Sequence, residues 1–404
     1  MRTSPSTRRR VTTLAGLTAL VGALVTAAPT TPASAGPGCA PAWRILPAPS
    51  GDVDVAGVDV LARDDVRFTE NLSHAGIRSL RWNGRALIEN GPQIPVPPRT
   101  GAGIQTSRIS FDAATSGWAL VNLHGPVRPD GAATLARWSG GRWTLTPSAV
   151  PTDPANGTPR ITDVASLAPG QAWAVGAAHG TGYQAVIERW DGTEWTMIDH
   201  PAAERPASSL NAVEAVSPTD VWAAGHVREG GVYRPLVLHY DGTAWTESPL
   251  PDLGPSGYLN AISAAGPDDV WVSGFTGTEA ESGPLLLHWD GTAWRTMPTP
   301  APGAHGTDLT RLYAAAPGDL WAIGVNNQQP NGFRLMHWDG TAWQDVRPQG
   351  AQPEEYGFNF ADVGGSGPED VWVVGTATFT EPSDIGYPYL RSRRLIAHLS
   401  CGGK

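Results

Sequence analysis

Short runs of apolar residues, each bounded by turn-forming residues, follow one another along most of the chain. In one representative stretch, residues 209–251, the runs occupy 210–216, 221–225, 236–240 and 244–248, and Asp241–Gly242 separates the last two. Such short runs, with an Asp-Gly pair between two of them, are typical of antiparallel strands joined by hairpins. No window shows a sustained helical period. The pattern therefore predicts an all-β fold built from units of four short strands.

This unit recurs with a period of about 50 residues. The tryptophans of an Asp-Val-Trp-x-x-Gly motif and its variants are spaced 49 to 51 residues apart, at Trp173, Trp222, Trp271, Trp321 and Trp372. An Asp-Gly-Thr-x-Trp motif follows each of the first four, as in residues 288–294 and 337–343. Four strands per period of this length indicate one blade of a β-propeller. Seven blades are predicted, at 51–98, 105–150, 159–203, 208–254, 258–303, 308–350 and 357–401.

The two ends of the repeat region complement each other. The seventh blade stops after its third strand, whereas residues 42–49 line up with 293–300, which form the fourth strand of the fifth blade. We expect this N-terminal strand to pair with the last blade, so that the ring closes without an unpaired edge. The two cysteines, Cys39 and Cys401, then fall where the turn between those strands would be. This placement predicts a disulfide that replaces the missing turn.

Residues 1–35 have the organisation of a secretory signal peptide. Arginines at 8–10 precede an apolar run over 11–28, and Ala33–Ser34–Ala35 provides a cleavage site. The run is too short and too weakly apolar to favour a membrane anchor. We therefore expect a secreted, extracellular protein whose domain spans 36–404, exported by either the Sec or the Tat route.

The charge of the chain limits its partners. Loss of four arginines with residues 1–35 takes the formal net charge from −10 to −14, which disfavours nucleic acid and anionic membrane surfaces as partners. We expect no nucleic acid, no membrane insertion and a monomer. Lysine occurs once, at Lys404, among many arginines and alanines, which is typical of a GC-rich, actinobacterial genome.

The repeat motifs carry a family resemblance. Asp-Gly-Thr-x-Trp resembles a relaxed Asp-box, and Asp-Val-Trp-x-x-Gly is similar to the second strand of kelch-like repeats. Residues 39–401 thus resemble secreted bacterial seven-bladed β-propellers of the kelch, Asp-box and related families. The kelch Gly-Gly doublet and the strict Ser-x-Asp-x-Gly box are not kept. The resemblance therefore implies an architecture and no catalytic residues.

The conspicuous residues of the motifs fit structural roles. All 17 tryptophans fall on predicted strands, where large rings pack between sheets. Four histidines share one motif position with arginines, which cannot ligate a metal, so a structural hydrogen bond is favoured over a ring of metal ligands. They are His239, His288, His337 and His398. The Asp of each Asp-Gly pair is predicted to form the turn. No metal site and no cofactor are predicted.

Candidate binding residues fall where the chain varies between repeats. The connections between strands 2 and 3, and between blades, differ in length and chemistry and share one face, which we predict to be the binding face. On or beside them lie Tyr183, Tyr233, Tyr258 and Tyr387, which could stack on sugars or, alternatively, pack at the rim. Asn211 and Asn260 start first strands, with Ser110, Thr162, Thr310 and Asn359 in related places. They could surround the channel mouth, or hydrogen-bond between blades.

These features predict a secreted binding module that recognises an extracellular glycan or protein. The alternatives are an extracellular lyase or glycosidase and a structural scaffold in a secreted assembly. Glu214, Asp59 and Asp362 on inner strands could supply a general acid and base. Arg108, Arg160 and Arg311 lie near first-strand ends without the convergence that sialidase chemistry needs. A propeller lyase similar to the streptogramin lyases is the best enzymatic alternative, but no matching His pair is present, and no catalytic residue is assigned.

Overall fold

The structure is a computed structural model that describes residues 41–47, 53–72, 76–94, 103–124, 134–151, 159–179, 182–254, 256–277, 283–300, 308–325, 333–348, 355–381 and 389–401. The first unit of the chain, Met1–Cys39, lies outside these ranges, so the predicted signal peptide and its cleavage stay predictions. No helix of the described residues is long and apolar enough to cross a membrane.

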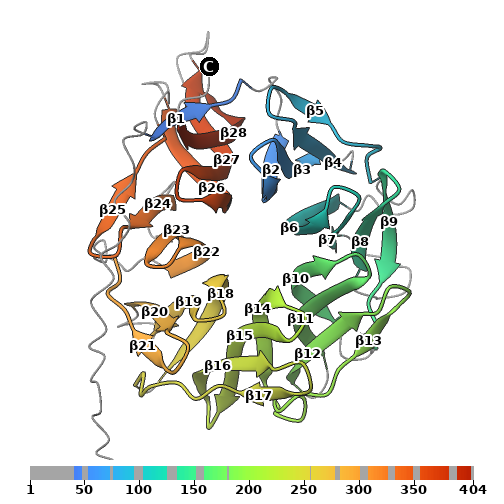
Figure 1. Cartoon of the computed structure of the whole chain (residues 1–404), viewed down its shortest axis with the longest axis vertical. Coiled ribbons are helices and arrows are strands. Elements are labelled where there is room, and N and C mark those ends of the chain that lie inside the picture. The colour runs from blue at the N-terminus through green and yellow to red at the C-terminus, as the bar shows by residue number, and fades with distance from the viewer. Residues whose placement is uncertain are drawn as a thin grey trace, which may run out of the picture. The chain divides into compact units, whose positions relative to one another are not determined.

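The second unit, Ala40–Lys404, contains seven four-stranded antiparallel sheets, which confirms the predicted seven-bladed β-propeller (Figure 1). The first three are β2 (Val53–Ala62), β3 (Asp65–Leu72), β4 (Gly76–Trp82), β5 (Leu87–Glu89); β6 (Gly103–Ala113), β7 (Ser116–His124), β8 (Thr134–Ser139), β9 (Arg142–Pro147); and β10 (Arg160–Ala168), β11 (Gln171–His179), β12 (Tyr183–Trp190), β13 (Trp195–Met197).

Blades four to six are β14 (Ser208–Ser217), β15 (Asp220–Glu229), β16 (Val232–Tyr240), β17 (Trp245–Glu247); β18 (Gly257–Gly266), β19 (Asp269–Thr276), β20 (Gly283–Trp289), β21 (Trp294–Thr296); and β22 (Asp308–Ala316), β23 (Asp319–Val325), β24 (Phe333–Trp338), β25 (Trp343–Val346). Blade seven is β26 (Glu355–Gly367), β27 (Asp370–Glu381), β28 (Tyr389–Cys401) and β1 (Pro41–Ile45). The first strand of each blade lies nearest the middle of the ring (Figure 1).

The N-terminal strand closes the ring as predicted. β1 pairs with β28 in a register that sets Trp43 opposite Leu399 and Pro41 opposite Cys401, and Figure 1 shows blue β1 beside red β28. Trp43 also packs edge-on against Trp321 of blade six, with ring centroids 5.7 Å apart. The termini therefore form a complete blade that packs on its neighbour.

Tryptophan pairs join several other neighbouring blades in the same way. Trp222 of β15 meets Trp294 of the next blade edge-on at 5.6 Å, and Trp173 meets Trp245 at 5.3 Å. Such edge-to-face pairs stabilise beyond the area that they bury. Most of the tryptophans are buried, so the predicted packing role is confirmed for them.

The motif histidines bind within their own blades. The Nε2 atom of His239 lies 2.8 Å from the Asp220 carboxylate, and the imidazole ring stacks on Trp222 at 4.0 Å. The same pairs recur as His288 with Asp269, His337 with Asp319, and His398 with Asp370. These contacts confirm the structural hydrogen bond predicted at this position and show that the two sequence motifs bind each other.

The motif aspartates organise the hairpin turns. Asp241 Oδ1 accepts hydrogen bonds from the backbone N–H groups of Thr243 and Ala244 and from the Thr243 hydroxyl, at 2.8, 3.0 and 2.6 Å. The same turn forms at Asp191, Asp290 and Asp339. The Thr243 hydroxyl and these N–H groups lower the pKa of Asp241 to about 2. The predicted role as turn former is confirmed.

A β-bulge interrupts the first strand of every blade near its start. In β14, Leu210 pairs with Gly225 and Ala212 with Ala224, so Asn211 is left over. The equivalent residues are Ala56, Ser107, Thr162, Asn260, Thr310 and Ala361. Ser110 and Asn359 do not share this register with Asn211. The sequence spacing alone grouped them with Asn211, since it does not reveal where the extra residue of the bulge falls. Bulges redirect the side chains beside them, and this one positions the candidate site.

We expect Cys39 and Cys401 to form a disulfide. Cys401 pairs with Pro41, but Cys39 lies outside the described residues, so the bridge remains a prediction. In protein exported to an oxidising compartment, neither cysteine should be alkylated unless a reductant is added, and the mass of the intact protein measures this. Cys401→Ser should lower the free energy of unfolding by about 4–5 kcal/mol in the chain-entropy model. Two alkylatable thiols in the unreduced protein would contradict the bridge.

Candidate functional site

A pocket of about 740 Å³ opens at one end of the central channel. We call it the mouth pocket; first-strand starts (β6, β10, β14, β18, β22), ends of β11 and β15, and starts of β12 and β16 line it. It therefore lies on the face predicted to bind. Five of the six predicted binding residues line it: Tyr183, Tyr233, Tyr258, Asn211 and Asn260. The sixth, Tyr387, lies outside the described residues.

Aromatic side chains form one wall of the mouth pocket. His226 contacts Tyr233 and Tyr258, with ring centroids 5.1 and 5.7 Å apart, and Tyr258 packs on Phe275. Burial lowers the pKa of His226. Tyr233 and Tyr183 remain 39% and 52% exposed. The wall therefore combines a packed aromatic base with two accessible tyrosines.

The bulge residues form a polar rim. Asn211 donates to the Leu259 carbonyl of the next blade at 2.7 Å, and the Thr162 hydroxyl donates to the Leu210 carbonyl at 2.7 Å. The Asn260 side chain interacts with the Tyr258 hydroxyl. Hydrogen bonding between blades, the alternative role weighed for these residues, is thus present at Thr162 and Asn211. Each bond also fixes the orientation of a side chain that lines the pocket.

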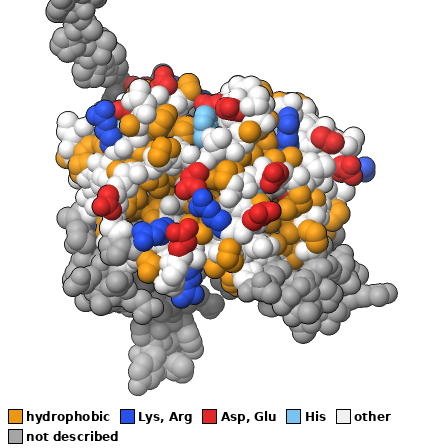
Figure 2. Space-filling view, turned by 90° about the horizontal axis from the view of Figure 1, so that it is seen from below, with side chains coloured by type: hydrophobic (Ala, Val, Ile, Leu, Met, Phe, Trp, Pro, Cys, Tyr) orange, Lys and Arg blue, Asp and Glu red, His pale blue; other side chains and the backbone are white. Residues whose placement is uncertain are grey.

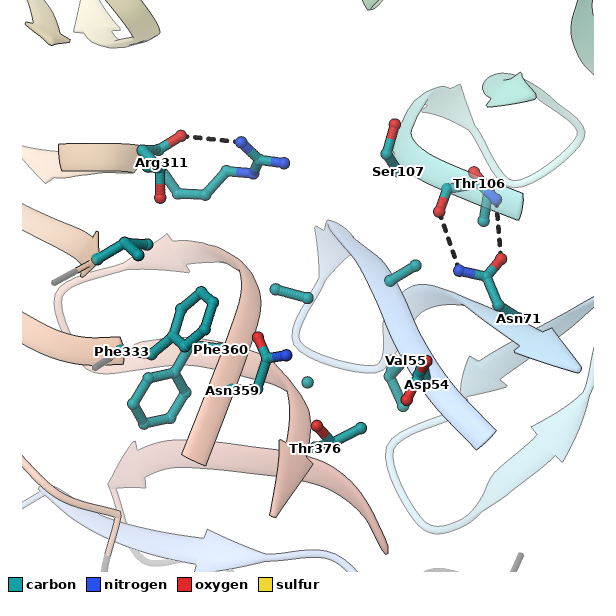
Figure 3. A pocket seen from close by; sticks show the side chains of 15 residues that line it. Asp54, Val55, Asn71, Thr106, Ser107, Arg311, Phe333, Asn359, Phe360 and Thr376 are labelled. Atoms are coloured by element: carbon teal, nitrogen blue, oxygen red, sulfur yellow. Dashed lines mark hydrogen bonds between the residues drawn. The ribbon is translucent and has the colours of Figure 1, made fainter. Parts of the chain in front are cut away.

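A smaller pocket of about 380 Å³ adjoins the mouth pocket, and we call it the side pocket (Figure 3). Its wall includes Phe333, Phe360 and Asn359. Arg311 lines both pockets, and Figure 3 shows its side chain extending from β22 towards the side where Ser107 lies. The two pockets therefore meet at Arg311, together with Ser107 and Thr310.

A charged cluster extends from the mouth pocket into the channel cavity, a third pocket deeper in the ring. The residue that follows the bulge is charged in four blades: Arg108, Asp163, Arg311 and Asp362. Arg108 Nε lies 3.4 Å from Asp163 Oδ1, and Arg108 Nη1 lies 3.5 Å from Asp362 Oδ1. Arg311 Nε lies 3.8 Å from the same Asp362 atom. The cluster therefore links four blades around the channel.

Two further carboxyl groups, those of Asp59 and Glu214, lie two residues after the position that follows the bulge on their strands. They line the channel cavity together with Arg108, Asp163 and Asp362. Burial raises the pKa of Glu214 to about 8, and Asp163 adds to the shift. Burial likewise raises the pKa of Asp59 to about 7, although the Phe111 N–H donates to its carboxylate. At neutral pH a large share of the Glu214 population is therefore protonated.

The arginine groups respond to the same surroundings. Burial lowers the pKa of Arg311 to about 10, and the positive charge of Arg108 adds to this effect. Burial also disfavours the charge of Arg108, but Asp163, Asp362 and Glu214 hold its pKa above the usual value. Nearby carboxylates therefore offset the cost of burying the positive charge less well at Arg311 than at Arg108.

Sequence reasoning did not foresee this convergence. Arg108, Arg160 and Arg311 were not expected to come together, yet all three line the mouth pocket, with Arg228. Only the equivalent positions of these residues in their repeats could have indicated that they converge, because Arg108 and Arg311 both follow the extra residue of a bulge. On the side of the protein shown in Figure 2, acidic and basic side chains are interspersed among apolar ones.

Comparisons with known proteins establish the fold. No family model and no curated protein matches the chain. A catalytically inactive virginiamycin B lyase from Staphylococcus aureus with quinupristin is similar, with a TM-score of 0.54, 13% identity, and coverage of 89% of this chain and 99% of that one. YCF48 bound to D1 peptide gives a TM-score of 0.51 at 14% identity, covering 89% of this chain and 96% of that one.

A GH74 xyloglucanase from Xanthomonas campestris also gives a TM-score of 0.51 at 14% identity. The match covers 84% of this chain but only 54% of the xyloglucanase. Likeness at these identities shows the β-propeller fold alone, because one fold serves many functions.

We expect Gly225→Ala to disturb both the blade and the pocket. A Cβ atom at this position would lie 2.0 Å from the Ser209 carbonyl oxygen, opposite the bulge at Asn211. Relieving that clash requires the backbone to shift, at a cost of about 1–3 kcal/mol. Gly266→Ala is the matched control, since no other atom lies within 4 Å of its added Cβ. Equal melting temperatures for the two variants would refute the assigned role of Gly225.

We expect the stability of the protein to fall as pH rises from about 4.5 to about 8. In this window the folded protein keeps the Glu214 proton that the unfolded chain has lost, so ionisation favours unfolding. Glu214→Gln should make the decline shallower and raise the melting temperature above pH 8 by roughly a few degrees. Glu194→Gln, at an exposed turn, is the control. Parallel stability curves for wild type and Glu214→Gln would contradict the shift.

Proposed function

We propose that this protein is a glycan-binding module that holds a saccharide in the mouth pocket. The observation that carries the proposal is the meeting of Tyr183, Tyr233 and Tyr258 with Asn211 and Asn260 in one pocket. Aromatic faces stack on the apolar side of sugar rings, and amides hydrogen-bond hydroxyl groups. A ring stacked on Tyr233 would lie beside this polar rim.

The shape of the site supports a small ligand over a protein partner. A volume of about 740 Å³ is in the range of small-molecule sites. A stable protein interface buries about 800 Å² on each partner, and the exposed tyrosines face a concave pocket. The similar structures bind different ligands, quinupristin in one and a peptide in another, so the choice rests on this pocket.

We further propose the setting in which the module acts. The basic, apolar and small-residue segments of residues 1–35 support export and an extracellular location. The Asp241-type turn, with its threonine hydroxyl, supports kinship with Asp-box and kelch-like repeats. An acidic net charge supports a partner other than nucleic acid.

One observation favours an enzymatic alternative, a lyase or glycosidase. A carboxyl whose pKa is about 8, as at Glu214, stays protonated near neutral pH and can act as a general acid. Glu214 lines the channel cavity below the mouth pocket, and Arg108 lines both. A saccharide that reached from the tyrosines into the channel would approach this acid.

A glycan array, followed by titration calorimetry on the saccharides that bind, tests the proposal. Tyr233→Ala should weaken binding about tenfold or more, because the stacking surface is lost. Leu145→Ala is the matched control, since Leu145 is 38% exposed on β9 and outside the pocket.

Equal weakening by both substitutions, or no saccharide bound at all, would overturn the proposal. Turnover of a bound saccharide that is lost in Glu214→Gln would replace the binding role by the enzymatic one.

A further inference from the structure

The two arginines at the channel mouth have more donors than partners. A guanidinium carries five N–H donors. Among the described residues, Arg311 makes one hydrogen bond, from Nη1 to the Thr310 carbonyl at 2.9 Å, and Arg108 makes none. Their contacts with Asp163 and Asp362, at 3.4–3.8 Å, are ion pairs without hydrogen-bond geometry. Buried polar groups are rarely left so incompletely bonded.

The side chains are buried enough for this to matter. Arg108 is 19% exposed and Arg311 25% exposed, and the Nε atom of Arg311 is itself buried without a hydrogen-bond partner. Both line the mouth pocket, and Arg311 also lines the side pocket. The unused donors therefore lie where a ligand would enter, in surroundings that strengthen electrostatic attraction.

The charge balance of the mouth pocket points the same way. Its lining contains four arginines, Arg108, Arg160, Arg228 and Arg311, and one acid, Asp308. Burial raises the pKa of Asp308, which weakens its negative charge. The carboxylates that compensate the arginines, Asp163 and Asp362, line the channel cavity and not the mouth pocket. In a chain of net charge −10, this pocket is a local site for an anion.

We propose that the saccharide bound by this protein is acidic, and that its carboxylate binds the Arg311 guanidinium where the mouth pocket meets the side pocket. This inference rests on the proposed glycan-binding function and names the class of glycan. A guanidinium matches a planar carboxylate through two parallel hydrogen bonds. Arg108 adds a second positive charge nearby, and Asp362 holds both arginines from the channel side.

The neighbouring pockets define the arrangement of the remaining sugar units. One ring would stack on Tyr233 in the mouth pocket, and another would approach Phe333 and Phe360 in the side pocket. Arg311 lies between these two places. The site thus fits an oligosaccharide of uronic acids better than a single neutral sugar.

The test compares a panel of uronic-acid oligosaccharides with their methyl esters, which keep the sugar rings and remove the charge. We expect calorimetry to show at least tenfold tighter binding of the acids. The preference should disappear in Arg311→Gln. It should survive in part in Arg311→Lys, which keeps the positive charge but cannot donate two parallel hydrogen bonds to a carboxylate. Arg334→Gln is the matched control: Arg334 lies in the same blade, is 30% exposed and pairs with Asp345.

The outcomes separate the two proposals. Equal affinity for acids and esters, or binding of neutral glycans alone, would overturn the acidic ligand and leave the glycan-binding module standing. Tighter binding of sulfated than of carboxylated saccharides would also overturn the carboxylate. Binding of no saccharide would remove the glycan-binding function and this inference with it. Circular dichroism will show whether Arg311→Gln is folded, and Arg311→Lys provides a second reading if it is not.

Discussion

The bulge near the start of each first strand is the local constraint on which the channel mouth depends. Where Leu210 pairs with Gly225, the two backbones approach so closely that no side chain fits on the second strand. In the five blades that keep the Trp-x-x-Gly motif, its glycine lies opposite this bulge in the inner strand. Because the bulge adds one residue, the side chains at and after it are redirected. In one blade these are Asn211 and Ala212, and in another Thr310 and Arg311.

This constraint divides the molecule into a repeated scaffold and a variable inner ring. The Asp220–His239 bond, the ring stack on Trp222 and the Asp241 turn recur outside the channel and hold each blade together. The inner ring carries charges that do not repeat from blade to blade. Ion pairs in a buried setting rarely add net stability, since desolvation costs about as much as the pairing gains. Stability alone therefore does not account for a charge cluster in the channel.

The sequence was sufficient to predict features that repeat along the chain and features that depend on a match between its two ends. Periodicity predicted the seven blades, and the match of 42–49 to 293–300 predicted the closing pair of β1 with β28. Loop position was enough to select Tyr183, Tyr233 and Tyr258, which the structure brings into one pocket. Their role in binding stays a prediction, as does that of Tyr387, which lies outside the described residues.

The sequence was not sufficient to predict contacts between residues of different blades across the channel. Arg108 and Asp362 are far apart in the chain and meet only because the ring closes. Their register also depends on a bulge whose extra residue differs in type between blades, so the sequence alone does not show that Ser107, and not Ser110, is the equivalent of Asn211. The proposed ligand site lies at this convergence. A crystal structure with a uronic-acid oligosaccharide measures it directly: we predict density that joins Tyr233 to the Arg311 guanidinium, and density only on the outer hairpins would contradict it.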